Sequence, residues 1–273
     1  MSAGAGGISI GVAGAAGRIG SELVKAILAD PHVRLGGALV RKGSAAEGKD
    51  IGEMLRAQAC GVIATADAKA FVKAIDVMVD LSLPKATETH VAAALAAGCP
   101  LVMGTTGIEA EGQHAINEAA KIIPIARVPS ASVGMAVLTL IVERAARALG
   151  ANYDAEVLNQ QHRKKADAPS GGALSLGAAA ARGRGIDLSV AAIIGRDGET
   201  GPRPKGAIGF STVAGGEGMV EHGIMFLGDG ESIAFTHRGA GRAIYTGGLI
   251  KAACWLKDRK PGLYGMADVL DLG

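Results

Sequence analysis

A dense cluster of ionisable and small residues lies in the middle of the chain, in the stretch 159-NQQHRKKADAPSGGA-173. It contains His162 and three cations, Arg163, Lys164 and Lys165, and it ends in Pro-Ser-Gly-Gly before an alanine-rich run that predicts a helix. Backbone N–H groups at a helix start bind anions, and neighbouring cations add charge of the right sign. The stretch therefore predicts a site for an anionic small molecule, although a solvated basic loop has the same composition.

The composition of the whole chain restricts the class of partner. Its 273 residues are 49% hydrophobic and 20% charged, with a formal net charge of +2, so we expect no nucleic-acid partner. No apolar run reaches the roughly 18–20 residues that span a bilayer, and the first residues lack the pattern of a signal peptide. Three cysteines at unrelated spacings indicate neither a disulfide framework nor a metal site. We expect a cytoplasmic protein with no membrane partner and no metal.

Short apolar runs and helical patterns alternate in the first half of the chain. The predicted strands are 8–14, 33–40, 61–65, 75–82 and 100–107, and the predicted helices include 20–30 and 86–98. This alternation is typical of a doubly wound, Rossmann-like α/β domain, in which helices cover both faces of a parallel sheet.

The second half has a different pattern. A long helix is predicted over 134–150, and longer strand-like runs follow at 153–162, 207–216, 219–228 and 231–239, after which 242–258 again reads as a helix. Three of the runs are consecutive and joined by turns that contain glycine, which favours a mixed or antiparallel sheet. We therefore predict a second, α+β domain.

A glycine turn lies between the first strand and the first helix. Gly14, Gly17 and Gly20 are spaced by threes, so that the backbone can approach a pyrophosphate at the helix N-terminus. About twenty residues further on, the second strand ends at Arg41 and Lys42 rather than at the carboxylate that binds the ribose of NAD. These residues predict a site for NADPH, with NADH possible.

Two later turns follow strands of the same predicted sheet. They are 80-DLSLP-84 and 104-GTTG-107, and they contain Ser82, Gly104, Thr105 and Thr106. Both belong at the carboxyl edge of a parallel sheet, where the nicotinamide end of a dinucleotide lies, unless they are ordinary turns.

Taken together, the motifs resemble one known family. They are the glycine turn, the D-x-S-x-P turn, the GTTG turn, the S-x-G of 132-SVG-134, the segment H-R-x-K-x-D-A-P-S-G, and the runs 195-GRDGETGPR-203 and 208-IGFSTVAGG-216. From about Ile8 to Leu272 the chain is similar to the dihydrodipicolinate reductases. The resemblance implies reduction of 4-hydroxy-tetrahydrodipicolinate, a cyclic imine dicarboxylate, to tetrahydrodipicolinate with NADPH or NADH in the diaminopimelate route to lysine. It also implies a homotetramer built through the C-terminal sheet.

The resemblance implies a division of the chain and a role for each motif. We predict a dinucleotide-binding domain over 1–130, on which 241–273 packs back, and a substrate-binding and oligomerisation domain over 131–240. Arg18 and Arg41 match positions that hold cofactor phosphates. The implied cofactor residues are Gly14, Ala16, Gly17, Arg18, Ile19, Arg41, Lys42, Ser82, Gly104, Thr105, Thr106 and Ser130. The implied substrate residues are His162, Lys165, Ser170, Gly171 and Gly172, and the implied catalytic positions are Gln161, His162 and Lys165.

Four positions depart from the family pattern. The first of two adjacent histidines, taken in the family as the acid, is here Gln161. The usual glutamate, threonine and asparagine are replaced by Asn159, Gly172 and Ser130. These changes gather around the expected substrate and acid rather than around the cofactor.

The departures leave the proton donor and the substrate open. An amide cannot supply a titratable proton, so His162, Lys165 or water would have to act. We predict the family reaction, with a diverged NADPH-dependent imine reductase or a catalytically weak NADPH- and dicarboxylate-binding homologue as alternatives. His222 and His237 lie in strand-like runs and are interpreted as structural.

Overall fold

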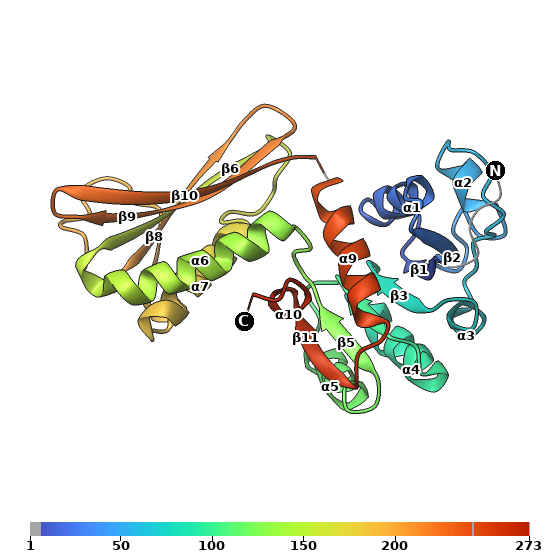
Figure 1. Cartoon of the computed structure of the whole chain (residues 1–273). Helices are drawn as coiled ribbons and strands as arrows, with labels where there is room; N and C mark the ends of the chain where they lie inside the picture. The colour runs from blue at the N-terminus through green and yellow to red at the C-terminus, as the bar shows by residue number, and fades with distance from the viewer. Residues whose placement is uncertain (1–6, 242, 273) are drawn as a thin grey trace. The chain divides into compact units, whose positions relative to one another are not determined.

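The computed structural model describes residues 7–241 and 243–272, and its elements are labelled in Figure 1. These residues form two compact units. The first unit runs to Val133 and takes in the segment after Gly241, and the second is Gly134–Gly241. The boundary falls at the start of the long helix α6 (Val133–Leu149), close to the predicted division at 130 and 131.

The first unit is built on a parallel sheet of six strands in the order β11-β5-β4-β3-β1-β2. The strands are β1 (Ile8–Ala13), β2 (Val33–Leu39), β3 (Val77–Asp80), β4 (Leu101–Met103), β5 (Pro124–Arg127) and β11 (Gly262–Gly265). The chain reverses its direction of travel across the sheet between β1 and β3, so the carboxyl ends of these two strands mark the switch point where α/β sheets bind ligands.

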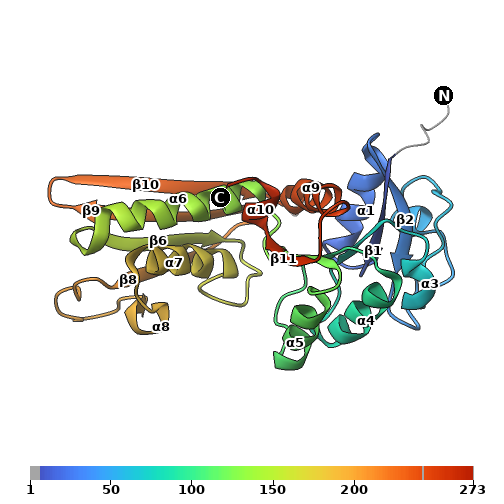
Figure 2. The same ribbon diagram turned by 60° about the horizontal axis from the view of Figure 1, so that its bottom comes forward.

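Helices cover both faces of this sheet, as Figure 2 shows. The helix α1 (Gly20–Ala29) packs beside α9 (Thr246–Leu256), while α3 (Ala68–Val72), α4 (Thr87–Ala97) and α5 (Ala110–Ala119) follow one another on the other face. The central strands are buried on both faces: Val12, Val79 and Val102 on one face and Met78 and Leu101 on the other are all 0% exposed. The predicted doubly wound α/β fold is confirmed.

Two details of the predicted sheet are wrong. The apolar run 61–65 forms only isolated bridges, through Ile63 to Asp50 and through Thr65 to Leu39. Gly61 has a φ of 75°, and its N–H donates to the Asp50 carboxylate at 2.7 Å rather than to a strand. In addition, β5 and β11 extend the sheet on the side away from β1, which the sequence pattern does not predict.

The second unit has a mixed sheet of five strands in the order β10-β9-β6-β8-β7. The strands are β6 (Asp154–Gln161), β7 (Ala192–Ile194), β8 (Ile208–Ala214), β9 (Met219–Gly228) and β10 (Glu231–Ala240). Neighbours β6, β8 and β7 are parallel, whereas β6, β9 and β10 pair antiparallel, so the expected mixed sheet is present.

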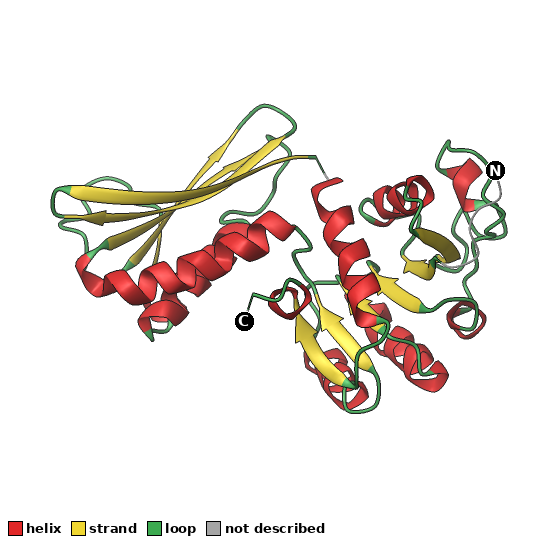
Figure 3. Cartoon of the chain, in the orientation of Figure 1, coloured by secondary structure: helices red, strands yellow, loops and turns green. Residues whose placement is uncertain are grey.

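Two helices, α6 and α7 (Gly171–Arg184), lie against one face of this second sheet (Figure 3). Their apolar sides bury the core of the unit, which includes Val142, Leu176, Phe210 and Phe226. Side chains alternate along β6, so that Val157 points into this core while Leu158, on the opposite face, is 44% exposed. The shorter elements of the chain are α2 (Ile51–Met54), α8 (Leu188–Ala191), α10 (Met266–Val269) and the 3-10 turns η1 (Pro84–Ala86), η2 (Gly150–Asn152) and η3 (Ala243–Tyr245).

Candidate active site

The glycine turn of the first unit is shaped by close backbone contacts. Gly14 has a φ of 78°, and a Cβ added there would lie 2.7 Å from the carbonyl oxygen of Leu81. A Cβ on Gly20 would lie 2.1 Å from the carbonyl oxygen of Gly14, and the same oxygen accepts a hydrogen bond from Gly17 N–H at 2.8 Å. Only glycine therefore allows β1, the turn and the start of α1 to come this close.

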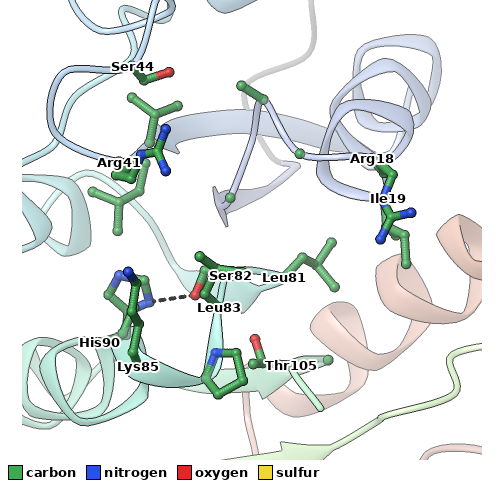
Figure 4. Close-up of a pocket in the computed structure, with 18 of the residues that line it drawn as sticks. Arg18, Ile19, Arg41, Ser44, Leu81, Ser82, Leu83, Lys85, His90 and Thr105 are labelled. Carbon is green, nitrogen blue, oxygen red and sulfur yellow. Dashed lines mark hydrogen bonds between the residues drawn. The ribbon is translucent and has the colours of Figure 1, made fainter. Parts of the chain in front are cut away.

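A cavity of about 710 Å³ opens at this turn, and Figure 4 shows its lining. Arg18 and Arg41 lie on opposite sides of the turn, and no acidic residue is among the described residues that line the cavity. The start of α1 also faces it, so backbone amides and two guanidinium groups surround a space large enough for part of a dinucleotide. The residues present fit a phosphate-bearing cofactor.

The structure brings together most of the predicted cofactor residues. Those lining the cavity are Gly14, Ala16, Gly17, Arg18, Ile19, Arg41, Ser82, Gly104, Thr105 and Thr106. Lys42 and Ser130, also predicted, are not among the lining residues. Lys85 and His90 line the cavity and were not predicted, because neither belongs to a recognised turn motif.

The buried side chain of Asp80 connects the two later turns through hydrogen bonds. Its carboxylate is 0% exposed and accepts hydrogen bonds from the Ser82 N–H at 2.8 Å, from His90 Nδ1 at 3.0 Å and from the Thr105 hydroxyl at 3.3 Å. One buried carboxylate thus fixes the turn after β3, the turn after β4 and a ring on α4. The predicted turn residues are therefore held in place by Asp80, which does not itself line the cavity.

In the second unit, the three cations of the central segment have different surroundings. Arg163 Nε donates to the Gly216 carbonyl at 3.4 Å, and Lys164 pairs with Glu217 at 3.0 Å, with both side chains exposed. Lys165 is only 26% exposed and pairs with Asp167, and this hydrogen bond lowers the pKa of the Asp167 carboxyl. The run therefore divides into two cations that fasten a loop and one that is half-buried beside α7.

The helix α7 begins at Ser170, the N-cap residue. Its hydroxyl accepts a hydrogen bond from the Ala173 N–H at 3.3 Å, and the Leu174 N–H donates to the Ser170 carbonyl at 2.9 Å. The N–H groups of Gly171 and Gly172 come before these two donors in the chain. They belong to the first turn of the helix, where backbone N–H groups can bind an anion. Exposed Gly171 and half-buried Gly172 follow Lys165 and His162 closely in the chain, and His162 is also half-buried.

A buried polar cluster, Asn159, Gln161, Ser170 and His222, lies beneath the start of α7. Each of the four residues is at most 7% exposed. His222 Nε2 lies 3.0 Å from Ser170 Oγ and 3.3 Å from Gln161 Nε2, and Asn159 Oδ1 accepts from Gln161 at 2.9 Å and lies 3.2 Å from Ser170 Oγ. His222 was interpreted as structural. It directly contacts two predicted site residues that lie 52 and 61 positions away in the sequence.

Burial lowers the pKa of His222 from 6.5 to about 4, and the nearby charges of His237 and Lys165 act in the same direction. The imidazole is therefore neutral near pH 7. Within residues 7–241 and 243–272, no group of three or more His, Cys, Asp or Glu side chains is arranged to hold a metal ion. Over the same residues, no helix is long and apolar enough to cross a membrane.

Comparisons with known proteins match both units. The family model described as dihydrodipicolinate reductase, N-terminus, matches residues 8–131, and the corresponding C-terminus model matches residues 134–270. The chain is 41% identical to the 4-hydroxy-tetrahydrodipicolinate reductase of Halorhodospira halophila, over 96% of this chain and 98% of that protein. It is 44% identical to the enzyme of the same name from Cereibacter sphaeroides, over 96% and 97%.

Solved structures match at the level of the fold. Dipicolinate-bound dihydrodipicolinate reductase from Paenisporosarcina sp. TG-14 superposes with a TM-score of 0.77 at 20% identity, covering 96% of this chain and 99% of that one. An amine dehydrogenase from Mycobacterium smegmatis superposes with a TM-score of 0.63 at 12% identity, covering 96% of each chain. At these identities the likeness shows a shared fold.

Proposed function

Because the chain belongs to the dihydrodipicolinate reductase family, we propose that it reduces 4-hydroxy-tetrahydrodipicolinate to tetrahydrodipicolinate, in the diaminopimelate route to lysine. The enzyme is an oxidoreductase that depends on NADPH or NADH. The observation that carries the proposal is that relatives with this one activity match both units over nearly their whole length.

The cavity of the first unit holds the cofactor. The glycine turn admits the pyrophosphate to within contact of the backbone, and Arg18 with the start of α1 stabilises its charge. Ser82, Thr105 and Thr106 stand at the carboxyl ends of β3 and β4 and orient the nicotinamide end. The bound cofactor supplies a hydride, and the protein supplies position and electrostatics.

NADPH is the preferred cofactor. Support comes from Arg41, which lines the cavity where β2 ends, and from the lack of any carboxylate among the described lining residues. A guanidinium group can bind the 2′-phosphate of NADPH, whereas the ribose hydroxyl of NADH would lack its usual acceptor. Lys42, outside the lining, adds positive charge nearby in the sequence.

The start of α7 binds one carboxylate of the substrate. The amides of Gly171 and Gly172 and the N-cap Ser170 supply neutral donors, while half-buried Lys165 and His162 supply charge or a further donor. Lys165 would exchange its bond to Asp167 for a charge-assisted bond to the substrate. Dipicolinate, the flat aromatic dicarboxylate named in the related structure, is the analogue that tests this site.

The reaction also requires a proton, and Gln161 cannot supply it. Its amide does not titrate and is tied to Asn159 and His222. His162, Lys165 or water is the donor in the family reaction. The amide at this position, together with Gly172, favours a diverged NADPH-dependent imine reductase as the second candidate function.

A homotetramer is the proposed assembly, formed through the face of the second sheet that α6 and α7 leave open. Leu158, Val213 and Leu227 are exposed apolar side chains on that face, at 44%, 67% and 37%. Burying an apolar sheet face of this kind in an oligomer interface is more favourable than leaving it exposed to water. Sedimentation velocity measures the assembly, and charged substitutions at Leu158 and Val213 should dissociate it.

Two measurements test the function. Consumption of NADPH should be followed with 4-hydroxy-tetrahydrodipicolinate as the substrate, and turnover of another cyclic imine carboxylate in its place would favour the second candidate. Dipicolinate should bind in the presence of NADPH, and Lys165→Ala should weaken it by on the order of 10-fold or more. Lys205→Ala, an exposed lysine outside the site, is the matched control. Equal binding by parent and Lys165→Ala would refute the anion site.

A further inference from the structure

The buried polar cluster beneath α7 contains two of the chain's departures from the family pattern and borders a third. Asn159 and Gln161 are two of its members, and the third departure, Gly172, borders it. The remaining members are the N-cap Ser170 and His222. Departures at separate places in the sequence are therefore linked through one side chain, that of His222.

His222 connects these residues from the neighbouring strand. It lies directly opposite Asn159 in the antiparallel pairing of β6 and β9, and opposite His237 in the pairing of β9 and β10. The two imidazole rings stack with centroids 6.4 Å apart. A Cβ added at Gly172 would lie 2.4 Å from His222 Nε2 and 2.7 Å from its Cδ2. The ring thus occupies the space that any side chain at position 172 would need.

The neighbours of the His222 ring give its Nε2 atom the role of an acceptor. With the Gln161 amide oriented so that its Nε2 donates to Asn159 Oδ1, the other N–H of this group faces His222 Nε2, which then acts as an acceptor. The Ser170 hydroxyl has a single proton, which we assign to this nitrogen at 3.0 Å rather than to Asn159 Oδ1 at 3.2 Å, while its oxygen accepts from the Ala173 N–H. The ring is neutral with its proton on Nδ1, consistent with a pKa lowered by burial.

We propose that His222 is a positioning residue for the substrate carboxylate. Its ring orients the Ser170 hydroxyl, and it fills the space beside position 172, so that only glycine fits there and no side chain covers the first amides of α7. The inference rests on the proposed function and deepens it, because the carboxylate site at the start of α7 is the same. It makes glycine at position 172 a consequence of the imidazole that fills the adjacent space. Gln161, which is itself bonded to Asn159, holds the imidazole in this orientation.

His222→Leu and His222→Gln test the role of the acceptor nitrogen. Leucine has similar bulk but cannot accept, so the dissociation constant for dipicolinate and the KM for the substrate should each rise by on the order of 10-fold. The kcat should stay within about threefold, because His222 positions a binding group and does not touch the reacting atoms. Glutamine can accept through its side-chain oxygen, so His222→Gln should recover most of the lost affinity.

A double-mutant cycle tests the contact with Gly172. Gly172→Ala should weaken dipicolinate binding in the parent but not in His222→Ala, where the space has been emptied. Gly171→Ala is the matched control, since a Cβ there meets no atom within 4 Å, and its effect should be the same in both backgrounds. The cycle also decides the matter if His222→Leu does not fold, as judged by circular dichroism.

The possible outcomes separate the two proposals. A parent that does not bind dipicolinate in the presence of NADPH would overturn the proposed function, and the role of His222 with it. A parent that binds, together with a His222→Leu variant of equal affinity or an additive cycle, would overturn the role of His222 alone. A fall in kcat with KM unchanged would also overturn it, since that pattern marks a proton donor.

Discussion

Lowering the pH should destabilise the second unit through the buried imidazole of His222. In the folded chain the pKa of this group is about 4, against 6.5 for an ordinary histidine. The unfolded chain therefore binds the proton first as the pH falls. The stabilising contribution is complete above about pH 6.5 and is lost progressively down to about pH 4.

The magnitude follows from the gap between the two pKa values. A gap of about 2.5 pH units, at about 1.4 kcal/mol per unit, gives a loss of about 3 kcal/mol between pH 6.5 and pH 4. The pKa of His237, stacked on His222, is also lowered by burial, so it contributes in the same direction. Protonation would also turn His222 Nε2 into a donor and set it against the amide of Gln161.

Urea unfolding followed by far-UV circular dichroism at pH 7 and at pH 4.5 measures this loss. Trp255, the only tryptophan of the chain, lies on α9 in the first unit, so its fluorescence reports that unit separately. His222→Gln should lose distinctly less stability than the parent between the two pH values. His114→Gln, the same change at an exposed position of α5, should behave as the parent does. Identical pH dependence of the parent and His222→Gln would refute the reasoning.

Three further outcomes are expected. Arg41→Ala should weaken NADPH binding by about 10- to 150-fold, the equivalent of roughly 1.5–3 kcal/mol, and leave NADH binding nearly unchanged, as titration would show; equal losses for both cofactors would exclude a 2′-phosphate contact. Gln161→His should raise kcat, by up to about 10²-fold, with little change in KM and with a new alkaline limb near pH 6.5 in the rate profile; an unchanged or lower kcat in a parent that is already fast would favour the diverged reductase. Gly183→Ala should lower the melting temperature by several degrees, because the new Cβ would lie 2.2 Å from the carbonyl oxygen of Glu143 where α7 crosses α6, whereas Gly247→Ala, whose Cβ meets nothing within 4 Å, should not. A Gly183→Ala protein as stable as the parent would show that the two helices can separate at little cost.

The local part of the fold is readable from the sequence. β1, α1 and the turn between them follow from apolar periodicity and from glycine spacing, both of which act within a few residues. The run 61–65 has the composition of a strand, but the amides of Cys60 and Gly61 donate to the carboxylate of Asp50 instead. Such a contact is settled by tertiary structure, so a window of sequence cannot show it.

The candidate site likewise has one part that the sequence predicts and another that depends on tertiary structure. The residues of the glycine turn were found because the motif that names them is contiguous. His222 was missed as a site residue because its relation to Gln161 depends on the register between β6 and β9. Asp80 lies in the predicted turn 80–84, but its function as a shared acceptor depends on His90 and Thr105, which reach it from other elements. Alternation along a strand was the only available signal for such residues.

The placement of β11 has a consequence for how the chain is made. This strand forms the outer edge of the first sheet beside β5, and α9 packs over β3, β4 and β5, yet both elements are translated after the entire second unit. At about 5–20 residues per second, a ribosome adds β11 roughly 7–27 s after β5. During that interval the nascent first sheet has an open edge and lacks the cover of α9 over β3, β4 and β5, while the inserted second unit already has all of its own strands. Synthesis therefore leaves the nucleotide-binding sheet as the last part to close, and a premature stop within the final thirty or so residues would leave that sheet exposed to aggregation and proteolysis.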